Sequence, residues 1–214
     1  MADFEHASFA EPAVDHSPVQ HAIRARRSLR RYRPEPVPRP VIEALLTAAI
    51  WAPSAHNRQP WRFGVIESGA RKESLARAMG ARLRHDLAAD GVPEAVIAAD
   101  TERSYDRITS APVLIALCLS MMEMDSYPDS GRNHNEYLMA VQSTAMAGQN
   151  LLLAAHEAGL GACWMCAPLF CPDVVGVALA LPDDWEPQGL ITLGYPAQTR
   201  EKTRKPLAES VLWR

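Results

Sequence analysis

The segment IWAPSAHNRQPWRF, residues 50–63, gathers hydroxyl, amide and imidazole groups in one short turn. A helix-like run ends there in a proline, and a tryptophan opens the next apolar segment. Ser54, Asn57 and Gln59 offer groups that can both donate and accept hydrogen bonds, as the alternating edge of a heterocyclic ligand requires. The same side chains could instead satisfy the free carbonyls at the end of a helix. Both interpretations stay open on this segment alone.

Arginines crowd the segment RARRSLRRYR, residues 24–33, where a predicted helix ends and the chain turns outward. Guanidinium groups bind phosphate through paired hydrogen bonds, and a serine hydroxyl adds a neutral donor. A second basic segment, REKTRKP, lies at the far end of the chain and contains Arg204 and Lys205. The two segments could meet on one phosphate, or each could be a solvated charged surface. The candidates for phosphate binding in the first segment are Arg26, Arg27, Ser28, Arg30 and Arg31.

A glycine-rich segment, GLGACWMCA at residues 159–167, is the third candidate for a ligand contact. Glycines let the backbone approach a flat ligand closely, and the amides that follow could face it. The alternative is a helix that ends at Gly159 and leads into a strand of the core.

A metal site is a rival interpretation of the same region. The order of residues is similar to that of the zinc deaminases, in which one His and two Cys hold the metal and Glu transfers protons. The residues concerned are His134, Glu136, Cys163 and Cys166. Ala162 stands where that signature has proline, which counts against zinc. A redox role for the Cys-x-x-Cys is not favoured either, because no thioredoxin-like βαβ pattern surrounds it.

Composition limits the classes of function. The 214 residues are enough for one sizeable core, and the 48% of hydrophobic and 22% of charged residues are typical of a folded soluble protein. A net charge of −3 argues against a broad surface for nucleic acid. No apolar run is long enough to span a bilayer, and the acidic start lacks the pattern of an export signal, so we expect a cytoplasmic protein. The four cysteines are expected to be thiols.

Helix and strand patterns alternate without a repeat or a linker. Helices are predicted after a cap at Ser17, over about 38–51, twice or three times within 71–110, over about 136–158, and at 172–181. Strands are predicted in WRFGVIES, PVLIALCL and QGLITLGYP, and after Gly159. Residues 121–133 are predicted to form a polar loop. We therefore expect one α+β domain at residues 17–214, preceded by a mobile arm at residues 1–16.

Taken together, RRSLRRY, APSAHNRQPW and GLGACW resemble the nitroreductase family of FMN-dependent proteins in their order and spacing. The resemblance runs from about Ser17 to the C-terminus. Within the family it is strongest to the flavin reductase domain that accompanies the glutamyl ligase of deazaflavin-cofactor biosynthesis, through RLRHDLAADGVP, SYPD and LPDDWEPQG. The resemblance implies an α+β fold, with a mixed sheet flanked by helices. It also implies an intertwined homodimer with FMN sites across the interface.

The resemblance assigns expected roles to individual residues. The segment 26–30 corresponds to contacts with the FMN phosphate and the pyrimidine edge, and Arg204 to a basic residue on the phosphate. Ser54 and Asn57 correspond to residues that reach the flavin, commonly from the partner subunit. The backbone of residues 165–167 corresponds to the stretch along the flavin ring. The cofactor-binding set implied is Arg26, Arg27, Ser28, Leu29, Arg30, Ser54, Asn57, Met165, Cys166, Ala167 and Arg204.

No side chain is implied as a catalytic nucleophile or base, because the flavin carries the hydride in this family. The predicted function is hydride transfer from NADH or NADPH through FMN to a small nitro, quinone, enone or deazaflavin-type acceptor. No nucleic-acid or membrane partner is expected. A non-catalytic flavin-binding module and the zinc deaminase-like hydrolase are the alternatives.

Overall fold

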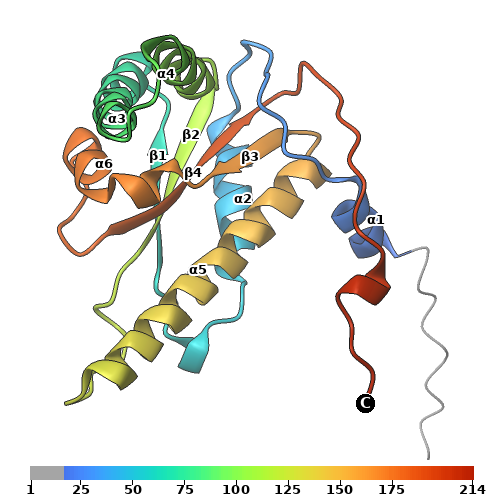
Figure 1. Ribbon diagram of the computed structural model, residues 1–214. Helices are drawn as coiled ribbons and strands as arrows, with labels where there is room; N and C mark the ends of the chain where they lie inside the picture. Colours follow the sequence, from blue (N-terminus) through green and yellow to red (C-terminus); the bar gives the residue numbers. More distant parts are fainter. Residues whose placement is uncertain (1–16) are drawn as a thin grey trace, which may run out of the picture.

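The structure is a computed structural model that describes residues 17–214; the predicted arm at residues 1–16 lies outside the described residues. Within that range the helices are α1 (Pro18–Ala25), α2 (Arg39–Ile50), α3 (Gly69–Ala89), α4 (Glu94–Thr109), α5 (Ser130–Glu157) and α6 (Pro172–Leu179) (Figure 1). The strands are β1 (Trp61–Ile66), β2 (Val113–Leu119), β3 (Gly161–Met165) and β4 (Glu186–Gly194). Three short 3₁₀ helices are η1 (Ala55–Asn57), η2 (Ala167–Phe170) and η3 (Leu207–Glu209).

The four strands form one sheet in the order β1-β2-β4-β3, with every neighbouring pair antiparallel. The central strand β2 is buried at every position, as its uninterrupted apolar sequence predicts. A single parallel bridge joins Ser28 to Ala162 and adds the segment after α1 to the free edge of β3. A mixed sheet was predicted. The only parallel pairing among the described residues is the one made by this added segment, and the four strands themselves are antiparallel.

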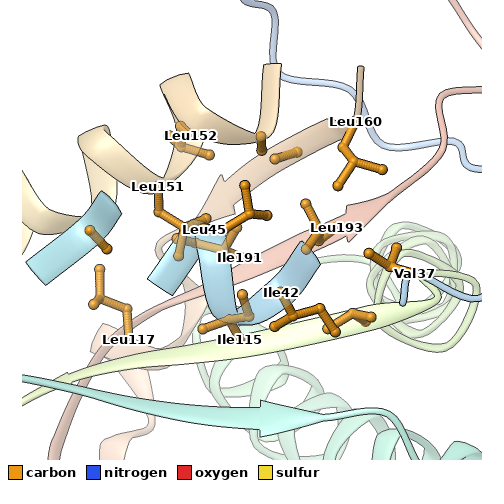
Figure 2. Packing of buried hydrophobic residues seen from close by; sticks show 14 residues of the cluster. Val37, Ile42, Leu45, Ile115, Leu117, Leu151, Leu152, Leu160, Ile191 and Leu193 are labelled. Atoms are coloured by element: carbon orange, nitrogen blue, oxygen red, sulfur yellow. The ribbon is translucent and has the colours of Figure 1, made fainter. Parts of the chain in front are cut away.

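Helices cover both faces of the sheet, which confirms the predicted α+β architecture (Figure 1). On one face α2 and α5 pack against β2 and β4. On the other face lie α3, α4 and α6, whose apolar side chains meet the alternate residues of the same two strands. Figure 2 shows the first of these cores, where Leu45 of α2 and Leu151 of α5 converge on Ile191 of β4. The sheet thus has a packed apolar core on each of its two faces.

The ends of the helices follow their capping residues. Ser17 caps α1 as predicted, since its hydroxyl accepts a hydrogen bond from the amide of Gln20 at 3.1 Å. The predicted start of α5 at Glu136 was too late, because Asp129 caps the helix by accepting from the amide of Arg132 at 2.9 Å. The first turns of α5 are polar and carry no apolar periodicity, so the sequence pattern did not reveal them. The predicted loop at 121–133 is correspondingly shorter.

The long helix α5 is enclosed by the rest of the chain on one side only. One side of it packs into the core through small residues, including Ala140, Ala147 and Ala155, all 0% exposed. On the outer side Leu138 is 42% exposed and Met146 is 39% exposed. The single chain therefore leaves part of the apolar surface of α5 in contact with solvent.

Trp164 of β3 occupies a slot between α5 and β4 that only glycine can form. A Cβ atom placed on Gly148 of α5 would lie 2.1 Å from Cζ3 of Trp164, and one placed on Gly189 of β4 would lie 2.6 Å from Nε1 of the same indole. Neither distance is compatible with van der Waals contact. The indole of Trp164 thus sets the spacing between α5 and β4.

We expect Gly148→Ala to destabilise the fold by about 1–3 kcal/mol, because the added methyl group overpacks the slot. Gly80→Ala is the matched control: Gly80 also lies inside a helix, but a Cβ there meets nothing within 4 Å. Gly80→Ala should raise the free energy of unfolding by about 0.5–1 kcal/mol through helix propensity alone. Urea unfolding of the two variants measures both effects. Equal stability of the two variants would show that Trp164 moves aside without cost.

Candidate functional site

The segment after α1 and the C-terminal tail enclose a hollow of about 320 Å³, which we call the basic basin. Apart from Ser28, its lining consists of Arg26, Arg27, Arg30, Arg200, Lys202 and Arg204. The sequence left open whether the two basic segments meet in space. The structure brings them together, although they are separated by most of the length of the chain.

Backbone hydrogen bonds hold the two basic segments side by side (Figure 1). The amide of Leu29 donates to the carbonyl of Ala162 in β3 at 3.1 Å, and the amide of Ala197 donates to the carbonyl of Arg31 at 3.0 Å. The segment after α1 therefore lies between β3 and the start of the tail. These contacts use only the main chain and occupy none of the arginine side chains, although Arg27 donates separately to the carbonyls of Arg24 and Arg26 through Nη1.

Tyr32 anchors the same segment to the centre of the sheet. Its hydroxyl lies 2.5 Å from the carbonyl oxygen of Leu29 and 2.6 Å from Oγ1 of Thr192 in β4. Burial raises the pKa of Tyr32 well above its ordinary value. The hydroxyl thus stays protonated and acts as a structural hydrogen-bonding group.

The electrostatics of the basic basin suit an anionic ligand. Burial lowers the pKa of Arg26, and the nearby charges of Arg204 and Arg27 lower it further. The Nε atoms of Arg26 and Arg27 are buried and have no hydrogen-bond partner within the described part of the chain. Like charges at short range and unsatisfied donors both cost free energy, and a bound phosphate would offset both costs. The residues present therefore fit a phosphate group.

Cys163 lies behind the basic basin rather than in it. The residue is 1% exposed, and burial raises the pKa of its thiol, while Arg30, Arg107 and a hydrogen bond with Ser28 oppose the rise. A buried thiol with a raised pKa is a poor nucleophile and a poor metal ligand. Cys163 thus contributes packing to this site.

Residues 165–167 carry the chain from β3 into η2. Met165 packs into the second core, and Cys166, at the turn between β3 and η2, has an exposed thiol. Because the bridge between Ser28 and Ala162 is parallel, the segment after α1 advances along β3 toward these residues. Among the basin residues in the segment after α1, Arg30 comes last in this direction. The side chain of Leu29 points the other way and packs over Gly161, so only its backbone borders this site.

The polar turn at η1 has a strained backbone. His56, Asn57 and Gln59 have φ angles of 49°, 55° and 51°, in the left-handed region that glycine usually occupies. Such angles cost free energy and persist only where neighbouring contacts enforce them. Here Ser54 Oγ accepts from the amide of Gln59 at 3.0 Å. The Ser54 hydroxyl thus stabilises the turn itself.

The turn and the basic basin lie far apart within one chain. The amide of Ala55 donates to Oγ of Ser143 in α5, whereas Arg26 and Arg27 border a hollow that also includes His156 of α5. Ser143 and His156 are separated along one helix by about 20 Å at 1.5 Å per residue. Figure 1 shows the same separation, with α1 beside one end of α5 and η1 near the other. Ser54 and Asn57 therefore do not join the basic basin of their own chain.

The four residues that could have held zinc, His134, Glu136, Cys163 and Cys166, do not form a metal site in the described structure. Among residues 17–214 no group of three or more His, Cys, Asp or Glu side chains is placed to hold a metal ion. His134 is exposed on the first turns of α5, and Cys163 is enclosed behind Ser28. The structure does not favour a deaminase-like hydrolase.

Sequence reasoning missed two residues of the basic basin and one beside it. Arg200 and Lys202 line the basin, and Arg107 of α4 is close enough to influence Cys163. The tail residues lie within the basic segment REKTRKP, so its charge pattern could have identified them. The sequence around Arg107 predicts only a helix, and nothing in it indicates a residue near the binding site. Lys205, which the sequence grouped with Arg204, points away from the basin toward Glu209, at 3.9 Å.

Comparison with known proteins places the chain in a family. The profile described as "Nitroreductase family" matches residues 23–195. A relative from Thermus thermophilus named NADH dehydrogenase is 33% identical over 209 residues, which cover 95% of this chain and 98% of the relative. A relative from Methanothermobacter thermautotrophicus, whose name gives NADH dehydrogenase/NAD(P)H nitroreductase, is 31% identical over 84% of this chain and 78% of its own length. The chain belongs to the nitroreductase family.

A solved structure agrees with this assignment. A nitroreductase of Desulfovibrio desulfuricans, crystallised in complex with FMN, is 32% identical and superposes with a TM-score of 0.72, covering 93% of this chain and 98% of its own. The fold and family expected from the three sequence segments are thus confirmed. The stronger likeness to the deazaflavin-associated domain stays a prediction. No helix among the described residues is long and apolar enough to cross a membrane.

Proposed function

We propose that this protein is an FMN-dependent oxidoreductase that transfers hydride from NADH or NADPH to a small organic acceptor. The observation that carries the proposal is the basic basin, where two segments from opposite ends of the chain present cationic side chains and orphaned donors to one small volume. A terminal phosphate fits that volume and that charge. Family membership and the FMN complex of the Desulfovibrio relative support the identity of the ligand.

The residues of this chain act by holding and orienting the cofactor. Arg26 and Arg204 would bind the phosphate, with the hydroxyl of Ser28 as a neutral donor. Arg30, farthest along β3, would reach toward the pyrimidine edge of the ring, and the backbone at Met165, Cys166 and Ala167 would lie along it. FMN, when bound, supplies the hydride chemistry that no side chain here provides. Arg27 and Leu29 complete the segment, the first through its guanidinium and the second through its backbone.

The second half of the site would come from a partner subunit. Ser54 and Asn57 are about 20 Å from the basic basin along α5, so one chain cannot present both halves to one flavin. A homodimer would also cover some of the apolar side chains that the single chain leaves exposed, namely those on α1, the end of α2, the outer side of α5 and the tail. They are Val19, Ile23, Ile50, Trp51, Leu138, Met146, Leu207, Leu212 and Trp213. We place the protein in the cytoplasm, where the donor and reduced thiols are available.

The direct test is reduction of the bound flavin. Protein purified with FMN should lose its absorbance near 450 nm, a property of flavins in general, when NADH or NADPH is added without oxygen, and recover it when a quinone or nitroaromatic is supplied. An oxidoreductase predicts both steps. Bound FMN that neither donor bleaches would indicate a flavin-binding module without this activity, and protein that binds no FMN would refute the proposal.

Arg26→Ala and Arg204→Ala should each weaken FMN binding about tenfold to a hundredfold, as expected for loss of one charge-assisted contact. Lys205→Ala is the matched control, because it removes a neighbouring positive charge that points toward Glu209 and not into the basic basin. Quenching of FMN fluorescence measures the three dissociation constants. If Lys205→Ala weakens binding as much as Arg204→Ala, the effect is one of overall charge and the assignment of Arg204 is wrong.

Mixed dimers test which subunit supplies each half of the site. Two chains are co-expressed, one carrying Arg26→Ala and Arg204→Ala, the other carrying Ser54→Ala and Asn57→Ala, after each is shown to bind FMN poorly by itself. In a two-fold dimer with shared sites, the mixed dimer has one site built entirely from unaltered residues, so it should bind about one FMN per dimer with native affinity. Sites contained within one subunit would leave both sites of the mixed dimer defective.

A further inference from the structure

A hollow of about 650 Å³ lies between α6, the end of β2 and the start of β4, and we call it the α6 hollow. It shares no lining residue with the basic basin and includes none of the turn at η1. Glu186, where β4 starts, borders it, whereas Gly194, where β4 ends, pairs with Gly161 near the basic basin. At about 3.4 Å per residue, roughly 27 Å of strand separates the two places. Figure 1 likewise shows α6 and α1 on opposite sides of the molecule.

Much of the surface of the α6 hollow is apolar. Leu119, Leu181 and Trp185 contribute buried or half-buried side chains to its lining. Met122 is 73% exposed and Val177 is 84% exposed, and both line the same space. Neither is among the side chains that the proposed homodimer would cover. Exposed apolar side chains around a concave surface favour a ligand with an apolar body.

The charged side chains of the lining are all negative. They are Asp173, Asp183, Asp184 and Glu186, and no Lys, Arg or His lines the α6 hollow. Arg82, from outside the lining, lies 2.6 Å from Asp173, and its hydrogen bond lowers the pKa of that carboxyl. In the described part of the chain no cationic group lies within 4.0 Å of the other three carboxylates. Three negative charges therefore have no counter-charge from these residues.

Neutral donors hold two of these carboxylates in place. The hydroxyl of Ser120, which is 0% exposed, donates to Oδ2 of Asp184 at 2.6 Å. Oε1 of Glu186 accepts from the hydroxyl of Tyr137 and from Nε2 of Gln188. Each carboxylate is thus fixed through one oxygen, and its other oxygen accepts no hydrogen bond from residues 17–214. A fixed carboxylate with a free oxygen is preorganised for a charged donor.

The remaining groups of the α6 hollow indicate the kind of cation. An ammonium group has three donors and can contact two carboxylates at once. The face of an indole also attracts cations, and Trp185 lines the same space. A metal ion fits less well, because no group of three or more His, Cys, Asp or Glu side chains among the described residues is placed to hold one. An apolar surface beside free carboxylates suits an organic cation.

We propose that the α6 hollow binds a small organic cation, a protonated amine attached to an apolar chain or ring. Asp184 and Glu186 bind the ammonium group, and Met122 and Val177 contact the apolar body. The volume of about 650 Å³ lies within the usual range of small-molecule sites. The site requires neither FMN nor the nicotinamide donor, so it is independent of the proposed function.

The test compares two probes of the same shape that differ in charge. The holoenzyme is titrated calorimetrically with phenethylamine and with phenethyl alcohol, which has the same apolar body and no charge. Phenethylamine should bind at one site per chain, at least about tenfold more tightly than the alcohol, because only the amine makes charge-assisted hydrogen bonds. Equal affinity for the two probes would overturn the proposal, as would absence of saturable binding of the amine.

Substitutions then locate the bound amine. Asp184→Asn and Glu186→Gln keep an oxygen for their neutral donors, and each should weaken amine binding about tenfold to a hundredfold. Glu43→Gln, which removes an exposed carboxylate on α2, is the control for overall charge and should leave binding within about threefold. An equal effect of Glu43→Gln, or no effect of either carboxylate variant, would refute the site.

Two further variants separate the α6 hollow from effects on folding and from the flavin. Val177→Lys places an ammonium group at an exposed position of α6 and should abolish amine binding while urea unfolding stays unchanged. Arg204→Ala, which should weaken FMN binding, should leave amine binding unaltered. Amine binding that is lost together with FMN would overturn the proposal, because the amine would then occupy the flavin site.

Discussion

The site depends on main-chain hydrogen bonds that force like charges together. The segment after α1 pairs with β3 on one side and with the beginning of the tail on the other, where the amide of Arg33 donates to the carbonyl of Tyr195 at 2.8 Å. The charges themselves oppose this arrangement: burial lowers the pKa of Arg26, and the charges of Arg204 and Arg27 lower it further. Main-chain pairing, supported by the buried hydroxyl of Tyr32, supplies the stabilisation that the side chains cannot. The basic basin is therefore preorganised for an anion before any ligand binds.

The sequence predicted the elements better than their arrangement. The apolar run of β2 and the serine cap of α1 are local signals, and local signals were sufficient for both. The start of α5 was missed because its first turns are polar and its cap, Asp129, resembles any loop residue. The strand order β1-β2-β4-β3 depends on which apolar faces meet in space, and no local pattern encodes that. The family resemblance supplied the overall fold.

For the site, too, the sequence indicates what depends on local pattern and does not indicate what depends on packing in space. Arg26, Ser28 and Arg30 alternate along an extended segment, so their types and spacing could indicate a common face. Whether Arg204 reaches that face depends on the path of the tail after β4, which charge pattern alone does not determine. Arg107 was unpredictable for a different reason. It comes from a helix whose own pattern is ordinary, and only the packing of α4 over the segment after α1 brings it near Arg30.

Glycine at two positions has a comparable long-range role. Gly148 and Gly189 come from different elements, and each lacks a side chain because the indole of Trp164 fills the space. From the sequence, a glycine in the middle of an alanine-rich helix suggests only weak helix propensity. In the structure it allows α5 to pack closely against the indole of Trp164 in β3. Residues 165–167 come directly after Trp164 in the chain, so the packing of the indole helps to position them.

In the proposed homodimer, each chain contributes one half to each of two sites. The basic basin is held by main-chain pairing at one end of α5, and the strained turn at η1 is held at the other by Ser54, by Ser143 and by the ion pair of Arg58 with Asp125. Positive φ angles at His56, Asn57 and Gln59 cost free energy, which contacts within the same chain offset. Because contacts within one chain hold both the basic basin and the turn, the proposed docking of two chains would not need to reorganise either half, and little of the binding free energy would be lost to ordering. The proposed composite site is therefore compatible with a subunit that is well ordered by itself. The length of α5 sets the distance between the two halves.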